Sequence, residues 1–260
     1  MSRPTIPAAP VVELRQITNR FGDHIIHEHL DLEIRAGETL AVVGGSGSGK
    51  TTLLRTMILL SRPNDGQVRL FGADALDLGE DEEQRLRTRL GVMFQQGALF
   101  SSLTVLENVT VPLTEHTLLP TPVVRELALL KLGLVGLEAE AAGRYPRELS
   151  GGMLKRAAVA RALALDPEIV FLDEPTAGLD PVSANAFDEL IVQLKETLGL
   201  TVVIVTHDLD TLWHATDRVA YLAERRVVAV APVAELADHA HAQIAAYFGG
   251  PRGRAARTAA

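Results

Sequence analysis

The sequence predicts an α/β fold with buried strands at its centre. Short apolar runs recur along the chain and alternate with segments of helical periodicity, which is the pattern of buried strands and of the helices that cover them. Four such runs are residues 39–43, 91–94, 169–172 and 202–205. Between the second and third of them, residues 97–165 have helical character throughout. This segment therefore predicts a helical insertion between two strands of one sheet.

Composition limits the class of protein. The chain has 260 residues, 47% of them hydrophobic, which is enough for one large domain or for a core domain with a subdomain. Its 25 basic and 33 acidic side chains give a formal net charge of −8, so we expect no nucleic-acid partner. The absence of cysteine excludes disulfides and thiolate chemistry. No apolar run approaches the roughly 18 residues that span a bilayer, and residues 1–10 do not resemble a secretory signal.

The N-terminal part predicts two strands, at residues 11–17 and 25–34, joined by a turn. His24, His27 and His29 cluster near the second strand. Because no cysteine or aspartate supports them, we interpret them as a solvated strand edge rather than as a metal site. Phe21 could stack on a nucleobase or pack within the turn, and both interpretations remain open at this point.

The apolar strand at residues 39–43 leads into a glycine-rich loop that fits the P-loop pattern G-x-x-x-x-G-K-[ST] without a gap. A helical segment follows, and its positive N-terminal end favours phosphate. We expect Lys50 to reach the β- and γ-phosphates of a nucleoside triphosphate and Thr51 to bind Mg²⁺. The complete predicted nucleotide-binding segment is Gly44, Gly45, Ser46, Gly47, Ser48, Gly49, Lys50, Thr51 and Thr52.

Apolar spacing also predicts the remaining helices and strands. Apolar spacing within the insertion predicts helices at residues 98–109 and 123–134, separated by prolines such as Pro112. Near the end of the chain, the pattern predicts a helix at 183–198, a pair of short strands at 217–222 and 226–231, and one helix at 234–248.

Polar side chains follow three of the buried strands. Gln95 comes after the strand at 91–94, Asp173 and Glu174 end the strand at 169–172, and His207 follows the strand at 202–205. Ligands of α/β sheets gather at this edge. Phosphoryl transfer depends on positioning and on charge stabilisation around the γ-phosphate. We expect Asp173 to hold Mg²⁺, Glu174 to orient or deprotonate the attacking water, and Gln95 and His207 to assist.

A second element that could bind an anion is Ser150-Gly151-Gly152, at the predicted start of a helix in the insertion. Its place away from the P-loop suggests a nucleotide shared by two copies of the chain. In such a dimer, the P-loop of one copy would face the Ser150 helix of the other. The alternative is an ordinary capped helix.

These motifs, in this order, resemble the nucleotide-binding subunit of an ABC transporter over about residues 11–230. The resemblance implies a P-loop NTPase (RecA-like) core with an N-terminal antiparallel β subdomain and an inserted helical signature subdomain. It implies one ABC ATPase domain at 11–248, with the helical subdomain at about 97–165 and flexible tails at 1–10 and 249–260. It assigns Phe21 to the A-loop, Gln95 to the Q-loop and Mg²⁺, and Ser150 to Gly152 to a signature acting in trans. Asp180 becomes the D-loop residue and His207 the switch histidine.

Two residues depart from the family pattern. Phe21 stands where the family usually has tyrosine, which preserves the stacking face, and Met153 stands where the signature usually ends in glutamine.

A closer likeness is to the ATPases of Mla/MCE phospholipid-transport systems, carried by residues 94–100, 108–120 and 149–153. It implies ATP and Mg²⁺, a homodimer, an integral membrane permease, a STAS-domain partner and an MCE lipid-binding protein. The ATPase would lie at the cytoplasmic face of the inner membrane. The segment 97–106 would meet the permease, through an apolar set that could instead belong to the core: Leu99, Phe100, Leu103 and Leu106.

Three alternatives compete with this interpretation. The first is an ABC ATPase with another cargo, such as a small-molecule importer or a lipoprotein-release system. The second is a soluble ABC ATPase of translation or DNA repair, a class that usually carries two cassettes or a long coiled-coil insertion. The third is a non-hydrolysing regulatory cassette, against which Glu174 argues.

Overall fold

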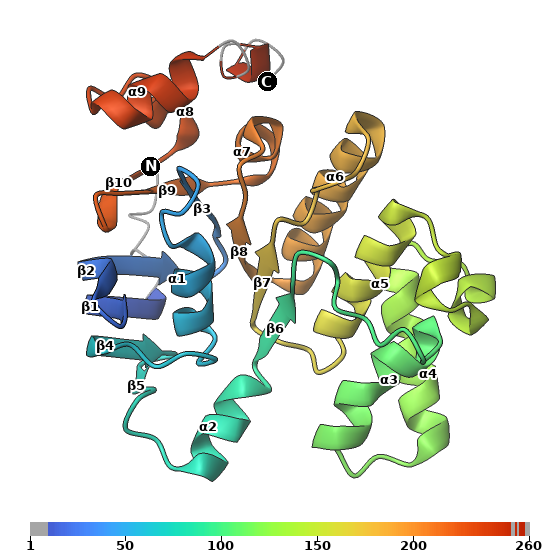
Figure 1. The fold of residues 1–260 in the computed structure, drawn as a ribbon. Coiled ribbons are helices and arrows are strands. Elements are labelled where there is room, and N and C mark those ends of the chain that lie inside the picture. The colour runs from blue at the N-terminus through green and yellow to red at the C-terminus, as the bar shows by residue number, and fades with distance from the viewer. Residues whose placement is uncertain (1–9, 251–252, 254, 258–260) are drawn as a thin grey trace, which may run out of the picture.

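The structure, a computed structural model, describes residues 10–250, 253 and 255–257 of the chain and confirms the predicted α/β fold (Figure 1). Its strands form two sheets, and its helices lie around them and in the inserted segment. The tails expected at residues 1–10 and 249–260 fall largely outside the described residues.

The N-terminal sheet is the predicted antiparallel subdomain. Its four strands in the described part of the chain are, in spatial order, β2 (His24–Arg35), β1 (Pro10–Phe21), β4 (Asp65–Leu70) and β5 (Ala73–Asp74). Each neighbouring pair is antiparallel. β1 and β2 are longer than the sequence predicted, because they pair along their whole length up to the turn at Gly22, whose φ is +58°. Buried residues alternate with exposed ones from Leu30 to Ile34 in β2, so one face of this sheet packs on the core, while β1 departs from strict alternation where its register shifts.

The central sheet is largely parallel. Its six strands in the described residues are, in spatial order, β10 (Arg226–Ala231), β9 (Arg218–Ala223), β3 (Thr39–Gly44), β8 (Thr201–Val205), β7 (Ile169–Asp173) and β6 (Leu90–Met93). The five strands from β9 to β6 are parallel to one another, and β10 pairs antiparallel at the edge. Because β3, β7 and β8 are buried on both faces, their sequences are continuous apolar runs rather than alternating ones.

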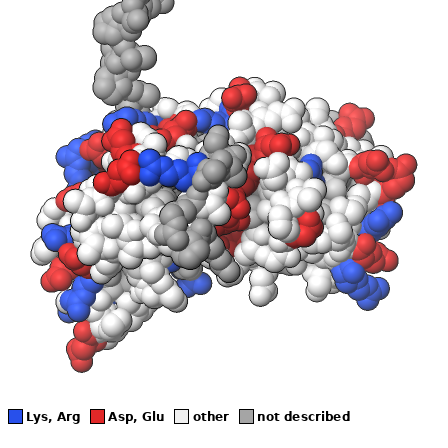
Figure 2. All heavy atoms as spheres, turned by 90° about the horizontal axis from the view of Figure 1, so that it is seen from above, with Lys and Arg blue, Asp and Glu red and all other residues white. Residues whose placement is uncertain are grey.

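Two apolar layers cover the central sheet. Leu40 and Val42 face the cluster shared with the N-terminal sheet, while Ala41 and Val43 face a cluster formed with the C-terminal helices. The helices outside the insertion are α1 (Lys50–Met57), α2 (Glu80–Arg87), α6 (Pro181–Leu198), α7 (Leu209–Ala215), α8 (Val233–Ala237) and α9 (Ala242–Gly249). Figure 2 shows the molecule from above, and the acidic and basic side chains on this face are interspersed.

The predicted insertion lies between β6 and β7. It contains α3 (Val105–His116), α4 (Thr121–Leu134), the 3₁₀ turns η1 (Ala139–Gly143) and η2 (Pro146–Glu148), and α5 (Gly151–Ala162). These elements form an apolar cluster with α6 and the facing side of the sheet.

The helix predicted at residues 98–109 is wrong in both of its ends. α3 begins at Val105, because Thr104 and Glu107 form a reciprocal capping box with bonds of 3.2 and 2.7 Å. The helix then continues through Pro112 to His116. Proline gives up one backbone N–H here, and the buried residues on either side, Val109 and Leu113, hold the helix together by packing.

The single helix predicted at 234–248 is also wrong, since the structure has α8 and α9 in its place. α8 ends at Ala237, and the polar stretch Asp238-His239-Ala240-His241 interrupts the apolar face before α9 begins. Asp238 instead accepts two bonds from Arg257, at 2.8 and 3.1 Å.

Candidate active site

The P-loop connects the end of β3 to the start of α1. Two of its glycines have backbone conformations and neighbours that exclude any side chain. A Cβ on Gly44, whose φ is +156°, would lie 2.3 Å from the carbonyl oxygen of Leu222. A Cβ on Gly49, whose φ is +95°, would lie 2.4 Å from Nε2 of His27. The loop is therefore seated directly on β9 and β2.

The start of α1 has no side-chain cap, since the cap residue is Gly49. The first N–H groups of a helix have no intrahelical partner, so an uncapped start offers them to an anion. Lys50 donates from Nζ to the carbonyl oxygens of Gly44 and Gly45, at 2.9 and 3.0 Å. The ammonium therefore lies at the mouth of the loop. This glycine cradle fits the phosphates of a nucleotide.

Three charges meet next to the loop. Burial lowers the pKa of Lys50, and the carboxylates of Glu174 and Asp173 oppose this shift. Burial and the charge of Glu174 raise the pKa of Asp173, against the opposing effect of three cations. Asp173 ends β7 and is only 7% exposed. The two acidic residues predicted from the strand end thus lie within electrostatic reach of the P-loop lysine.

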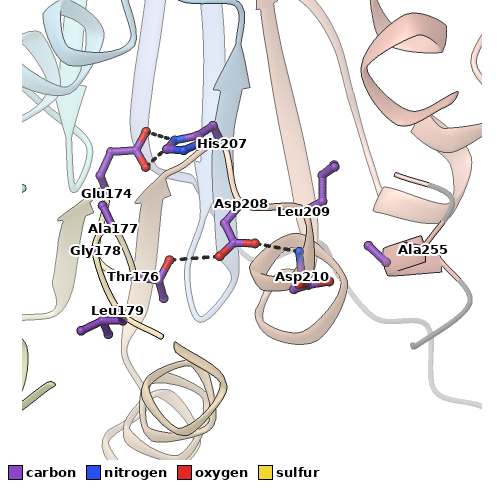
Figure 3. Close-up of a pocket in the computed structure, with 11 residues that line it drawn as sticks. Glu174, Thr176, Ala177, Gly178, Leu179, His207, Asp208, Leu209, Asp210 and Ala255 are labelled. Atoms are coloured by element: carbon purple, nitrogen blue, oxygen red, sulfur yellow. Dashed lines mark hydrogen bonds and ion pairs between the residues drawn. The ribbon is translucent and has the colours of Figure 1, made fainter. Parts of the chain in front are cut away.

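Glu174 and His207 form a pair across two strand ends. Nδ1 of His207 lies 2.9 Å from Oε1 and 2.8 Å from Oε2 of Glu174, a pairing that places the ring proton on Nδ1. Glu174 itself has a left-handed backbone, with φ of +47°, and its N–H bonds to the carbonyl of Val205 at 2.8 Å. This conformation turns its side chain out of the strand direction and toward the histidine (Figure 3).

A cavity of about 570 Å³ lies beside this pair (Figure 3). Its walls are the loop from Glu174 to Leu179, the loop from His207 to Asp210, and Ala255 and Ala256 near the C-terminus. Across it, Thr176 donates to Asp208 at 3.4 Å, and Asp208 accepts the N–H of Asp210 at 3.0 Å. The first of these bonds joins the loop after β7 to the loop after β8, and the second lies within the loop after β8.

Three other predicted residues, Phe21, Gln95 and Thr51, are exposed. Phe21, at the end of β1, is 62% exposed, so little of its ring packs within the turn. Gln95 is exposed two residues after β6, and Thr51 is exposed in the first turn of α1, next to the half-buried Thr52. Each is accessible to a ligand, and the nucleotide and metal roles expected for them stay predictions.

The serine–glycine element lies elsewhere. Ser150 caps α5 by accepting the N–H of Met153 at 3.3 Å, and its side chain is exposed. In Figure 1, the strands β6, β7 and β8 separate α5 from α1. Asp180 caps α6, where it accepts bonds from the N–H groups of Val182 and Ser183 at 3.1 and 3.0 Å. A single chain therefore does not bring Ser150 to its own P-loop.

The residues expected to bind Mg²⁺ offer oxygen donors only: the carboxylate of Asp173, the hydroxyl of Thr51 and the amide oxygen of Gln95. The described residues contain no group of three histidine, cysteine or acidic side chains that could hold a metal by itself. Such an oxygen set fits Mg²⁺, which is usually bound through one or two carboxylates together with substrate phosphates.

His27 supports the loop and was misjudged from the sequence. It is fully buried rather than on a solvated edge, and Asn19 lies 3.0 Å from its Nδ1. Burial lowers the pKa of His27 to about 4, with the Ser48 backbone opposing the shift. Residue spacing argued against burial, because His27 lies an odd number of residues from Leu30, Leu32 and Ile34, and only the irregular register between Ile17 and Asn19 brings it to the buried face.

Tyr247 was missed as well. This residue of α9 donates from its hydroxyl to the carbonyl oxygen of His207 at 3.3 Å, and its ring packs edge-on against Tyr221 at 5.6 Å. Burial raises its pKa. No spacing rule could have found a contact between residues 40 positions apart.

The uncapped glycine cradle, the lysine within it and the acidic strand end beside it define a P-loop nucleoside triphosphatase. The family model described as "ABC transporter" matches residues 27–177, and the chain belongs to this family. It is an ATP-binding ATPase.

Proteins similar to this chain are also ATP-binding subunits or cassettes. The chain is 40% identical, over 84% of its length and 83% of the relative's, to the intermembrane phospholipid transport system ATP-binding protein MlaF of Haemophilus influenzae. It is 38% identical to the probable ribonucleotide transport ATP-binding protein mkl of Mycobacterium leprae, over 87% of this chain and 65% of that protein. Among solved structures, the dimeric post-hydrolysis state of the ATP-binding cassette MJ0796, bound to ADP and phosphate, superimposes with a TM-score of 0.76. That chain is 35% identical, with 85% of this chain and 98% of MJ0796 covered.

Among the described residues, no helix combines the length and apolar character needed to cross a bilayer.

Proposed function

We propose that this chain is the ATP-hydrolysing subunit of a transporter that moves phospholipid between the inner and outer membranes. It acts as a homodimer at the cytoplasmic face of the inner membrane, attached through a separate integral membrane permease. The observation that carries the cargo is the likeness to an intermembrane phospholipid transport ATPase, which extends over most of both chains.

The proposed dimer places the P-loop of one copy opposite the Ser150 end of α5 in the other. Two observations support it. Ser150 is exposed and lies across the central strands from α1 of its own chain, and the similar cassette MJ0796 is dimeric. In this arrangement Gly44 to Thr52 hold the phosphates, Phe21 stacks on the base, and Ser150, Gly151, Gly152 and Asp180 complete the site from the partner.

Hydrolysis follows from the strand-end groups. Glu174 takes a proton from the attacking water, whose oxygen bonds to the γ-phosphorus while the bond to the bridging oxygen breaks. His207 donates from Nδ1 to Glu174 and keeps that carboxylate in place. Gln95 and Asp173 would hold Mg²⁺ with Thr51, and the ion would supply charge stabilisation to the phosphate oxygens when bound.

The Glu174→Gln variant tests this chemistry. The amide keeps the size of the side chain but cannot take a proton, so turnover should fall by at least about 100-fold while ATP still binds. A coupled phosphate assay and a fluorescent-nucleotide titration measure the two quantities. Normal turnover by this variant would show that another group acts on the water.

The partners are a permease, a STAS-domain protein and a periplasmic MCE lipid-binding protein. Within the segment expected to meet the permease, Phe100 is 51% exposed, whereas Leu106 is 8% exposed and belongs to the apolar core. Phe100 is therefore the stronger contact, and Leu106 is removed from the proposed surface.

A second cargo comes from the relatives named as probable ribonucleotide transport proteins. To separate the two, the Glu174→Gln variant is isolated from membranes with ATP, and bound small molecules are identified by mass spectrometry. Phospholipid recovered with a permease supports the proposal. A ribonucleotide other than ATP or ADP, recovered in place of lipid, favours the second cargo. Recovery of the chain only in the soluble fraction, with the permease coexpressed, contradicts both.

A further inference from the structure

Lys155 is a buried charge that the proposed chemistry does not use. It lies in α5, five residues after the Ser150 cap, and is only 5% exposed. Lysine is seldom buried this deeply without partners, because removing an ammonium group from water is costly. The hydrogen-bond partners of its ammonium group therefore indicate the role of Lys155.

Its partners are two backbone carbonyls of the catalytic segments. Nζ of Lys155 donates to the carbonyl oxygen of Gln95 at 2.5 Å and to that of Glu174 at 3.3 Å. Gln95 follows β6 and Glu174 follows β7, so one side chain from the inserted helical region bridges two neighbouring strand ends. Burial lowers the pKa of Lys155, and the carboxylates of Glu174 and Asp173 oppose this shift, which shows that they are close by.

The backbone of Glu174 needs such support. Its φ of +47° is a left-handed conformation, which is unfavourable for a residue with a side chain. Three hydrogen bonds hold it: its N–H donates to Val205, and its carbonyl accepts from Lys155 and from the N–H of Ala177 at 3.2 Å. Lys155 provides the one bond among these three that comes from the inserted helical region, so without it the peptide after Glu174 is no longer tied to α5.

The same helix also fixes the segment after Gln95. Arg161, near the end of α5, donates to the carbonyl oxygens of Gly97 and Ala98 at 2.9 and 2.7 Å. α5 therefore contacts residues 95–98 at three carbonyls, and Lys155 adds the link to Glu174.

We propose that Lys155 is a positioning residue, which ties the Ser150 end of α5 to the Gln95 and Glu174 backbone of its own chain. A helix is rigid over five residues, so a displacement of Ser150 on meeting the partner's nucleotide moves the Lys155 ammonium with it. Nucleotide on the P-loop of one subunit would therefore act, through Ser150 and Lys155 of the second subunit, on the placement of Glu174 in the second subunit. This inference rests on the proposed shared site.

The test compares Lys155→Met with Lys131→Met in the full chain. Methionine keeps the length of the side chain but removes its charge and its donors. Lys131 is the matched control, since it is 4% exposed in the same helical region and bonds to Asp166 instead of to the catalytic segments. The measurements are fluorescent-nucleotide affinity, kcat, KM, the Hill coefficient for ATP, and unfolding in urea.

We expect Lys155→Met to bind nucleotide and to show KM within about twofold of the wild type, while kcat falls about 10- to 100-fold and the Hill coefficient falls toward 1. Lys131→Met should keep kcat and the Hill coefficient, whatever its stability. Lys155→Arg, which retains charge and donors, should recover part of the loss.

Unchanged kcat in folded Lys155→Met overturns the inference. So does a loss of nucleotide affinity that matches the loss of kcat, because this would indicate general damage to the fold. Should Lys155→Met not fold, Lys155→Gln replaces it under the same criteria. Absence of turnover or of ATP-dependent dimers in the wild-type protein would contradict the proposed function instead, so the two failures are distinguishable.

Discussion

Two helix starts, those of α1 and α5, are rich in glycine and offer backbone N–H groups, yet they are built in opposite ways. α1 starts at Gly49 with no side-chain cap, on a loop seated against β2 and β9 and with Lys50 at its mouth. α5 starts at Ser150, which caps its own helix, and a Cβ on Gly152 would meet nothing within 4 Å. One start is enclosed by its own chain, and the other is open.

This difference indicates which helix start binds phosphate within one subunit and which is available to the other subunit. The enclosed start has the lysine, the strand-end carboxylates and the rigid loop that phosphate binding requires. The start of α5 has free space at Gly152, and in the proposed dimer it completes the nucleotide site of the other copy. Substitutions at the start of α1 should therefore weaken nucleotide binding by a single subunit. Substitutions at the start of α5 should leave that binding unchanged and should impair closure of the dimer.

The largest effect is expected from Lys50→Ala. Loss of the ammonium at the mouth of the loop should weaken ATP binding and lower turnover by more than about 100-fold. Isothermal titration and a phosphate-release assay measure the two quantities. Undiminished turnover would remove the P-loop from the proposed chemistry.

The Ser150→Arg variant probes the open start. A long cation in the space before α5 should block closure of the dimer and lower turnover about 10- to 100-fold, with ATP binding to the single subunit unchanged. Size-exclusion chromatography with ATP, in the Glu174→Gln background, measures closure. If this variant dimerises as well as its Glu174→Gln parent, the shared site is wrong.

A pair of glycine substitutions compares the two starts by stability. Gly49→Ala combines a left-handed φ with a contact of 2.4 Å to His27, and should lower the free energy of unfolding by about 3 kcal/mol. At Gly152, which lies in a helix, an alanine side chain has free space. Gly152→Ala should therefore leave the free energy of unfolding unchanged or raise it by up to about 1 kcal/mol. Urea unfolding measures both variants. Similar losses in the two would contradict the enclosed–open distinction.

The last prediction concerns pH and the histidine on which Gly49 is seated. Because the pKa of His27 is lowered to about 4 from its ordinary 6.5, the native state binds fewer protons than the unfolded state. The stability this provides is complete above pH 6.5 and is lost as the pH falls toward 4. Between pH 7.5 and pH 5 the loss should be about 2 kcal/mol.

His27→Gln should remove this part of the pH dependence from urea unfolding curves. His24→Gln, at an exposed position of the same strand, is the control and should keep the wild-type dependence. An unaltered slope in His27→Gln would show that the buried imidazole is not the titrating group.

Much of this arrangement follows from sequence patterns alone. The P-loop and Asp173-Glu174 were placed correctly relative to the sheet, because a strand buried on both faces is a short apolar run and the residues that follow it lie at one edge. The start of α3, by contrast, was predicted wrongly at residue 98, although Thr104 and Glu107 have the spacing of a capping box.

Other features depend on contacts between distant parts of the chain. The burial of His27 requires the irregular pairing of β1 with β2, and Tyr247 reaches His207 only because α9 packs on β9. The two carbonyls that Lys155 contacts come from segments 60 and 19 residues away. Local periodicity contains no information about such long-range partners.

The cavity beside Glu174 and His207 has a practical consequence for anyone producing this protein. Part of its wall is Ala255 and Ala256, whose side chains are single methyl groups. A larger residue in place of either alanine would narrow the cavity next to the carboxylate of Glu174. Versions of the protein intended for kinetics should therefore keep both alanines.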